Sequence, residues 1–380
     1  MLCTLSAFHP IRPHYEIDQE KILDWIAEAH ARAAHRFDNQ EIGAFRSQVR
    51  DKLVQLGCSK ERIATRGIHI HDLFQEDWAK MEIYPVKESP HGNGFTERSH
   101  FYDREVFQVF ERFYPEGISL PNHLVHVTCT GYVAPSPAQK IVSFRNAGRT
   151  TTVTHAYHMG CYASIPAIRM GAGYVSLPSP SQEICVDIVH TELSSLHMHP
   201  MRHSAEQLLV QSLFADGFIK YTLSSSSPKE KHLKILALHE ETIPDSSHCM
   251  GWRCESHGLG MTLSKEVPVL ISRELIGYLQ RLSSRAGLDF QALIRDSVFA
   301  IHPGGPKILQ QIKDLAKLEP HQVEHSVSVL KQYGNMSSAT LPHIWEKMLN
   351  DPKVPKGGKI VSLAFGPGLC ISGGLFEKGS

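Results

Sequence analysis

A polar, proline-containing segment, SSSSPKEKH (224–232), divides the chain into two parts with the same local pattern. Before it, LVHVTCTG (124–131) predicts a buried strand and AEQLLVQSLF (205–214) predicts a helix. After it, residues 267–287 predict a long amphipathic helix, and SVFAIHPGG (297–305) predicts a strand that runs into a tight loop. Strands that alternate with helices on both sides of a linker favour an α/β fold built from two halves.

We place these halves at residues 1–224 and 233–380. The last part of the second half, residues 359–376, predicts two closing strands around a Gly-Pro-Gly turn. No short repeat period is visible, which argues against a solenoid. A chain of 380 residues is long enough to bury a core with a cavity inside it.

The overall charge indicates neither a nucleic-acid partner nor an acidic membrane, because 39 basic residues balance 39 acidic ones. No apolar run approaches the roughly 20 residues of a membrane-spanning helix, and the first residues contain prolines and histidines where a signal peptide would be apolar. We therefore expect a cytoplasmic protein without membrane insertion. The eight cysteines include no CxxC pair, which argues against a disulfide framework and a structural zinc site.

Three segments place a reactive side chain beside glycine. Cys161 follows Gly160 at the start of a predicted helix, where free N–H groups and the helix dipole would lower the pKa of its thiol. His302 ends a predicted strand, and Asn335 follows Gly334 between two predicted helices. Taken singly, each has a plain alternative: a buried thiol, a surface histidine or a helix-capping asparagine.

The order Cys, His, Asn also serves papain-like hydrolases, so the local contexts must decide between reaction types. The sequence resembles the type III polyketide synthases, the chalcone and stilbene synthase-like family of the thiolase-fold group, and in particular its bacterial members. The shared motifs keep the family's order over roughly residues 50–376. They are GCYAS (160–164), LFADG (213–217), GMTLSKEVP (260–268), IHPGGP (301–306), YGNMSSA (333–339) and FGPGL (365–369).

This resemblance implies two similar α/β halves packed as a five-layered αβαβα core, and a decarboxylating condensation. Cys161 would take an acyl group from coenzyme A as a thioester, with His302 holding its thiol as a thiolate. His302 and Asn335 would then donate hydrogen bonds to the malonyl-CoA thioester oxygen and stabilise the enolate left by carbon dioxide. The expected product is a pyrone or a resorcinol-type ring.

The same resemblance predicts a gate and a cavity. Phe214 matches the aromatic gate of the family, whereas Met261 replaces the second aromatic and would make the gate softer. Along the cavity wall Glu192 matches, while Ser194 and His197 replace two threonines of the plant enzymes. The larger His197 predicts a narrower or more polar cavity.

Three further positions surround this cavity by resemblance. Ser337 keeps a small hydroxyl near the catalytic asparagine, and Cys129 replaces another plant threonine, as in several bacterial relatives. Cys129 is either a second cavity thiol or a packing residue. Ala134 replaces the methionine that plant enzymes insert into the partner's cavity, which would open the floor of the site. A homodimer is still expected.

The coenzyme A site is the weakest part of the match. Lys60 alone matches the basic cluster that holds the phosphates in plant enzymes, and Gly304 with Gly305 would let the backbone approach the ligand. An acyl carrier protein is therefore an alternative donor of one substrate. Acyl-CoA and malonyl-CoA are expected as substrates, with no permanently bound cofactor and no metal.

Two other hypotheses about the function compete with that of a type III polyketide synthase. A single-condensation β-ketoacyl-acyl-carrier-protein synthase III-like enzyme has the same fold and triad, but usually carries His-Gln-Ala-Asn where this chain has HPGGP. A metal-binding protein is suggested by HIH (69–71) and HMH (197–199), since alternating residues of a strand share one face. Neither histidine pair has a carboxylate or cysteine at fixed spacing beside it.

Overall fold

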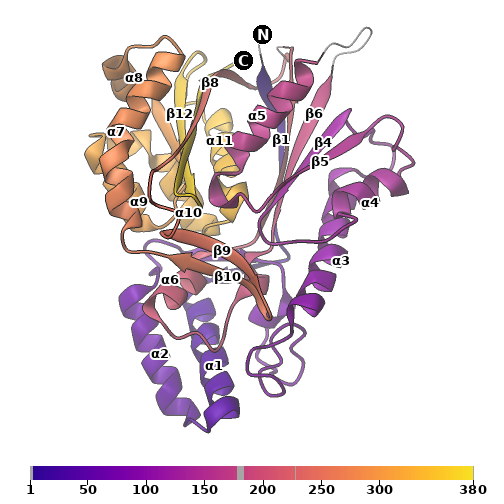
Figure 1. Ribbon diagram of the computed structural model, residues 1–380, viewed down its shortest axis with the longest axis vertical. Helices are drawn as coiled ribbons and strands as arrows, with labels where there is room; N and C mark the ends of the chain where they lie inside the picture. Colours follow the sequence, from indigo (N-terminus) through magenta and orange to yellow (C-terminus); the bar gives the residue numbers. More distant parts are fainter. Residues whose placement is uncertain (1–2, 178–183, 227, 380) are drawn as a thin grey trace.

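The computed structural model describes residues 3–177, 184–226 and 228–379, and most of its strands belong to one large mixed sheet (Figure 1). Residues 183–194 have the apolar pattern that predicts a strand, and residues 224–232 are predicted to be a linker; Glu183 of the first segment and Ser227 of the second lie outside the described residues. Among the described residues the nine strands of this sheet are β1 (Thr4–Ile11), β4 (His123–Thr128), β5 (Thr152–Tyr157), β6 (Cys185–Glu192), β7 (Gly217–Ser224), β8 (Leu233–Thr242), β11 (Val298–Ile301), β12 (Lys359–Gly366) and β13 (Cys370–Lys378).

The sheet repeats one pairing pattern on its two sides. On the first side, β1 and β7 are antiparallel, β7 and β6 are antiparallel, and β6 and β4 are parallel. On the second side, β8 and β13 are antiparallel, β13 and β12 are antiparallel, and β12 and β11 are parallel. The two sides meet where Thr4 pairs with Lys234 and Leu5 with Leu233. The predicted α/β class with two similar halves is confirmed, and the boundaries at 224 and 233 remain predictions.

Two helices lie between the halves. Helix α5 (Ser164–Val175) packs against β4, β6 and β7 of the first half and also against β13 of the second. Helix α11 (Thr340–Asn350) packs against β1 and β7 on one side and β11 on the other. Figure 1 shows both near the centre, between β12 and the strands of the first half. A helix covered on several sides must be apolar on several faces, and Ile344 and Trp345 of α11 are fully buried.

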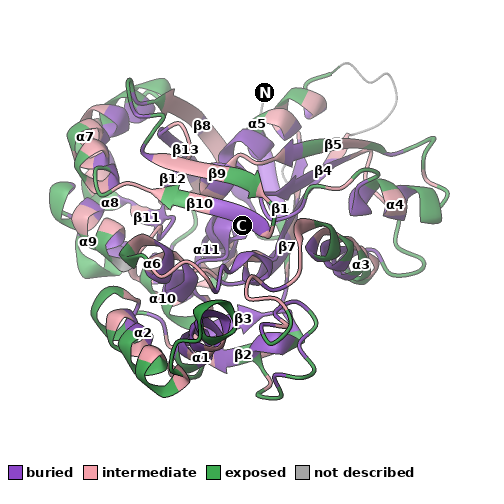
Figure 2. Cartoon of the chain, turned by 60° about the horizontal axis from the view of Figure 1, so that its bottom comes forward, coloured by how far each residue is buried: buried purple, intermediate pink, exposed green. Residues whose placement is uncertain are grey.

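The other helices cover the outside of the sheet and one end of it. Figure 2 shows exposed faces on the peripheral helices α2 and α9, around a buried interior. No described helix is long and apolar enough to cross a membrane. The remaining helices are α1 (Gln19–Asp38), α2 (Ile42–Leu56), α3 (Phe95–Phe113), α4 (Pro137–Phe144), α6 (Ala205–Leu213), α7 (Val267–Arg285), α8 (Phe290–Asp296), α9 (Pro306–Leu315) and α10 (Glu324–Tyr333).

Short elements complete the end of the sheet that carries the candidate site. The hairpin of β9 (Met250–Glu255) and β10 (Gly258–Leu263) crosses this end in Figure 1, and β2 (Tyr15–Asp18) pairs with β3 (Thr65–Ile68). Single-turn helices connect the strands to the longer helices there. These turns are η1 (His71–Leu73), η2 (Gly160–Tyr162), η3 (Ser194–His197), η4 (Pro320–Gln322) and η5 (Ser337–Ala339).

Candidate active site

Cys161 lies in the turn η2, between β5 and α5. Gly160 before it has φ +78, and a Cβ at that position would come within 2.6 Å of Pro367 Cδ in the turn between β12 and β13. Glycine therefore permits both the sharp turn and the close approach of the two segments. The first residue of α5 is Ser164, so Cys161 precedes the helix by three residues.

The thiol of Cys161 differs from the sequence prediction in its acidity. Burial raises its pKa to about 12, the nearby Glu192 carboxyl adds to this rise, and the contact with Ser337 opposes it. The expected lowering by the helix N-terminus was wrong, because withdrawal of the thiol from water outweighs the attraction of the helix dipole.

Asn335 is held by its backbone beside the end of α6. Its N–H donates to Leu213 O (3.1 Å), and its carbonyl oxygen accepts from Ala215 N (2.8 Å). The side-chain oxygen Oδ1 accepts from Ser337 N (2.9 Å). The amide nitrogen Nδ2 is buried and has no hydrogen-bond partner in the described part of the chain. One end of this amide is fixed, and the other is a free donor.

His302 lies at the carboxyl end of β11, where its N–H donates to Leu363 O of β12 (2.7 Å). The neighbouring β12 packs against η2, which carries Cys161. Both ring nitrogens of His302 are buried and unpartnered among the described residues. Burial lowers the pKa of His302 to about 3, so its imidazole is neutral and carries one N–H. Unpaired buried donors are unfavourable, which indicates a ligand oxygen at this place.

A third group of sequence-predicted residues surrounds Glu192. Its carboxylate accepts from Cys129 N (3.1 Å) and from Cys129 Sγ (3.2 Å). Ser337 Oγ lies 2.8 Å from Cys129 Sγ and 3.8 Å from Cys161 Sγ. The structure therefore brings Glu192, Cys129 and Ser337 together with Cys161.

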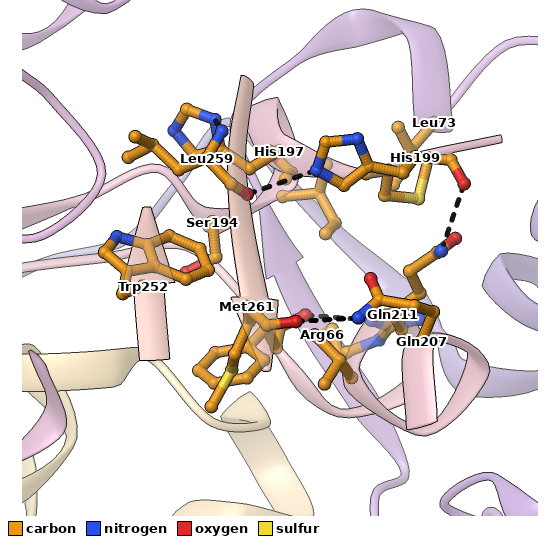
Figure 3. A pocket seen from close by; sticks show the side chains of 15 residues that line it. Arg66, Leu73, Ser194, His197, His199, Gln207, Gln211, Trp252, Leu259 and Met261 are labelled. Atoms are coloured by element: carbon orange, nitrogen blue, oxygen red, sulfur yellow. Dashed lines mark hydrogen bonds between the residues drawn. The ribbon is translucent and has the colours of Figure 1, made fainter. Parts of the chain in front are cut away.

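A narrow pocket adjoins this cluster, and Figure 3 shows its walls. Phe214 lines it, and the backbone of Phe214 pairs with that of Asn335 through a β-bridge. The predicted gate and wall residues Met261, Ser194 and His197 line the same pocket. Its cavity volume is only about 30 Å³, so a long acyl chain requires these side chains to move.

His197 narrows the pocket without adding free polar atoms to it. Its Nδ1 accepts from Leu259 N (3.1 Å), so Nε2 carries the hydrogen and donates to Thr130 O (2.8 Å). Burial lowers its pKa to about 3. Of the two sequence-based alternatives, the narrower wall fits this geometry better than the more polar one.

The predicted positions outside this pocket are more exposed. Ala134 lies on the surface in the turn before α4. Lys60 is exposed and pairs with Asp18 Oδ2 (3.2 Å), whereas Arg62 lines an open surface pocket together with Lys307. At Gly304 and Gly305 no atom would approach an added Cβ within 4 Å, so a ligand can reach this backbone.

Sequence reasoning missed most of the residues that line the pocket, and two of these hold its walls in place. Arg66 is buried, and its Nη1 donates to Gln211 O (2.7 Å) and Phe214 O (2.8 Å), which fixes the end of α6. Trp252 of the β9–β10 hairpin donates from Nε1 to Cys129 O and covers His197 edge-on. Neither residue stands in a motif, and their partners are far away in sequence, so no local signal could have revealed them.

The histidines of HIH and HMH do not converge on a metal site within the described residues. His71 Nδ1 bonds Tyr15 OH (2.9 Å), while His199 Nε2 bonds Leu259 O (3.2 Å). His69 instead lies with His14 and Glu105, one of three described groups whose ligand atoms are close enough for an ion. None of these groups includes a residue of the Cys161 cluster. The alternating pattern therefore reflects separate hydrogen bonds.

Comparisons with known proteins point in one direction. Residues 234–378 match the family of chalcone and stilbene synthases, C-terminal domain. The chain is 29% identical over 255 residues to probable polyketide synthase 1 of Dictyostelium discoideum. This alignment covers 66% of this chain but only 8% of the much longer relative. It is 24% identical over 294 residues to 1,3,6,8-tetrahydroxynaphthalene synthase of Streptomyces coelicolor, covering 76% of each chain.

Solved structures share the complete fold. The C-terminal type III polyketide synthase domain of Steely1 from Dictyostelium superposes with a TM-score of 0.82, at 21% identity and full coverage of both chains. The Streptomyces coelicolor tetrahydroxynaphthalene synthase gives a TM-score of 0.78 at 22% identity, covering 99% of each chain. The predicted thiolase-like fold is confirmed.

The buried histidines predict a steep loss of stability in mild acid. His30, His190, His197 and His302 have pKa values lowered by burial to about 3, from an ordinary 6.5. Between these values the unfolded chain binds more protons, so stability is greatest above about pH 6.5 and falls as the pH decreases. The slope is up to about 1.4 kcal/mol per pH unit for each histidine. Urea unfolding at pH 7.5, 6.5 and 5.5 measures it, and an unchanged midpoint would contradict neutral buried rings.

His302→Leu tests whether its ring nitrogens are unpaired in the free protein. An apolar side chain of similar size removes the unpaired polar atoms, so we expect the free energy of unfolding to rise by about 1 kcal/mol. His190→Leu is the matched control, because both nitrogens of His190 are bonded, to Ser338 Oγ (3.0 Å) and Tyr221 OH (3.1 Å). The control should lower stability, and equal losses in both variants would show that His302 has partners.

Proposed function

We propose that this chain is an acyltransferase of the type III polyketide synthase kind, which it resembles in its fold and in its C-terminal domain, and that it performs decarboxylative condensations. It loads an acyl starter on Cys161, extends the starter with malonyl-CoA and cyclises the product. The observation that carries this proposal is the pair of buried, unpartnered donors, His302 and Asn335 Nδ2, in the segments that pack around Cys161.

The loading step transfers the acyl group from coenzyme A to Cys161. The thiolate adds to the acyl thioester carbonyl, the bond to the coenzyme A sulfur breaks, and a new thioester forms on Sγ. The thiol must lose its proton for this step, because only the thiolate is an effective nucleophile. The high pKa of the free thiol means that a nearby group has to accept that proton.

The extension step needs a site for developing negative charge. The malonyl thioester oxygen accepts hydrogen bonds from the imidazole N–H of His302 and from Asn335 Nδ2 as carbon dioxide leaves. A neutral imidazole can donate without giving up its proton, which suits an enolate that must remain reactive. The enolate carbon then attacks the acyl thioester on Cys161, and the chain grows by two carbons.

The finer assignments are also part of this proposal. Phe214, Met261, Ser194 and His197 would limit the starter and the chain length, and the narrow pocket favours a small ring such as a pyrone or resorcinol. We also propose a cytoplasmic homodimer with the exposed Ala134 near the partner subunit. The alternative, a single-condensation β-ketoacyl-acyl-carrier-protein synthase III-like enzyme, is disfavoured by the family match over residues 234–378.

The loading residue can be identified by intact mass. Incubation with a panel of acyl-CoA starters should leave an acyl adduct on the protein, and Cys161→Ala should abolish it. His302→Ala and Asn335→Ala should each slow carbon dioxide release from malonyl-CoA about a hundred-fold, the effect of losing an oxyanion donor. An adduct that survives Cys161→Ala, or unchanged carbon dioxide release, would remove the residue concerned from the mechanism.

The phosphates of coenzyme A can be located by charge removal. Arg62 and Lys307 line one open pocket, next to the accessible backbone of Gly304 and Gly305, and we place the phosphates there. The double variant R62A/K307A should raise KM for acyl-CoA about ten-fold, because two phosphate partners are lost.

The control is the matching N-acetylcysteamine thioester, which has no phosphates and whose KM should not change. Lys60→Ala tests the position inferred from resemblance, and its pairing with Asp18 leads us to expect a small effect. If R62A/K307A leaves KM for acyl-CoA unchanged, the phosphates bind elsewhere or an acyl carrier protein delivers the substrate.

A further inference from the structure

A histidine, a cysteine and a glutamate meet at the base of the β9–β10 hairpin. His248 and Cys249 come directly before β9, and Glu266 lies between β10 and α7, as the residue before the helix. His248 Nε2 lies 3.4 Å from Cys249 Sγ and 3.5 Å from Glu266 Oε2. The three atoms all lie within 4.8 Å of one another. The two ends of the hairpin therefore present three metal-ligand atoms to one point.

The distances between these atoms fit the edges of a tetrahedral metal site. Zinc binds thiolate sulfur at about 2.3 Å, and imidazole nitrogen or carboxylate oxygen at about 2.0–2.2 Å. At tetrahedral angles these bonds place sulfur about 3.6 Å from nitrogen, and nitrogen about 3.4 Å from oxygen. The observed 3.4 Å and 3.5 Å are close to these values. The three side chains are thus already spaced as zinc ligands.

Hydrogen bonding alone accounts poorly for the position of the histidine. One ring nitrogen offers either one hydrogen or one lone pair. His248 Nε2 therefore cannot donate to the Glu266 carboxylate and accept the Cys249 S–H at the same time, although it faces both groups. A metal ion between the three atoms satisfies all of them together, because each then supplies one lone pair.

The ligand types select a metal of the zinc class. Thiolate sulfur and imidazole nitrogen suit zinc, whereas magnesium and calcium prefer sites built from oxygen. The Cys249 thiolate and the Glu266 carboxylate together balance the two positive charges of the ion. The side chains of His248 and Glu266 are 61% and 64% exposed, so an ion can enter from solvent and water can fill the fourth position.

The backbone fixes the cysteine in place. Cys249 is fully buried, its N–H donates to Ser246 O (2.9 Å), and its carbonyl oxygen accepts from Ser264 N (2.7 Å). Ser246 Oγ in turn accepts from Leu369 N (2.6 Å), in the turn between β12 and β13. One ligand is therefore held rigidly, while the two exposed ligands can adjust to the ion.

The hairpin that these residues close carries part of the pocket wall. Trp252 of β9 and Met261 of β10 line the pocket, and they are paired across the hairpin. Met261 O also accepts from Gln207 Nε2 (2.7 Å), which connects β10 to α6. An ion that joins Cys249 to Glu266 holds both ends of the hairpin together. Trp252 and Met261 then have less freedom to move away from the pocket.

We propose that His248, Cys249 and Glu266 bind a zinc ion that clamps the base of the β9–β10 hairpin. Cys249 binds as the thiolate and releases its proton to water. The site departs from the expectation of no metal, which rested on the absence of a CxxC pair. A single cysteine leaves no such signal, and the glutamate comes from the far end of the hairpin. The proposal does not depend on the proposed function, since the site lies outside the Cys161 cluster.

Cobalt(II) tests the site, because a thiolate bound to cobalt gives a charge-transfer band in the near ultraviolet. The full chain, stripped with a chelator and kept reduced, should bind one equivalent of cobalt with this band, and zinc should displace the cobalt. Cys249→Ser should lose the band. Cys254→Ser is the matched control, because Cys254 is an exposed thiol of the same hairpin, and it should keep the band. Absence of the band in the parent chain, or its survival in Cys249→Ser, would overturn the proposal.

Two surface variants test the site even if Cys249→Ser fails to fold. His248→Ala and Glu266→Gln should each weaken zinc binding by about ten-fold or more, measured by competition with a zinc-binding dye, because the ion loses one of three protein ligands. His14→Ala is the control, since His14 belongs to a different group of metal-ligating side chains, and it should leave the affinity unchanged. Unchanged affinity in both hairpin variants would exclude this site.

Hydrogen exchange measures the clamp itself. With zinc at about 100 times its dissociation constant, the amides of residues 250–263 should exchange about ten-fold more slowly, since opening the base of the hairpin must release the ion. Glu266→Gln should lose this slowing at the same zinc concentration. Equal exchange with and without zinc, in a parent chain that binds the ion, would show that the ion does not restrain the hairpin and would overturn the clamp.

Discussion

The burial of α5 and α11 between the two halves of the sheet is the constraint on which the site depends. Each helix packs against strands of both halves. Both halves of the sheet therefore need these helices to bury one of their faces. Cys161 lies in the turn that leads into α5, and Asn335 lies shortly before α11. The turns that precede these helices, η2 and η5, pack against each other and bring these residues together, and the end of β11 adds His302.

Burial in this interior also determines the protonation states of the titratable groups of the site. Withdrawal from water raises the pKa of Cys161 and Glu192 and lowers that of His302. Each group is thus held in its neutral form more firmly than in solution. The unpaired donors of His302 and Asn335 are left for an oxygen that arrives with the substrate.

The sequence predicted those features that depend on local pattern. The α/β class followed from alternating strand and helix signals. Asp18, a residue type favoured at helix N-caps, caps α1, with Oδ1 accepting from Glu20 N (2.9 Å). Glycine neighbours singled out Cys161 and His302. The direction of the thiol pKa could not be predicted, because it depends on how strands distant in sequence cover the turn. The backbone partners of His197 also required the fold, since they come from two separate loops.

The place of β1 in the sheet has a consequence for the order in which the molecule is completed. This strand precedes the other described strands in the chain, yet it lies between β7 and β8, and Thr4 pairs with both Ser224 and Lys234. The first half can close its own sheet once β7 has been synthesised. The other edge of β1 remains unpaired until β8 has been synthesised. An unpaired strand edge is a site for mispairing between chains. A nascent chain arrested before β8 would therefore be more prone to aggregate than one that has passed it.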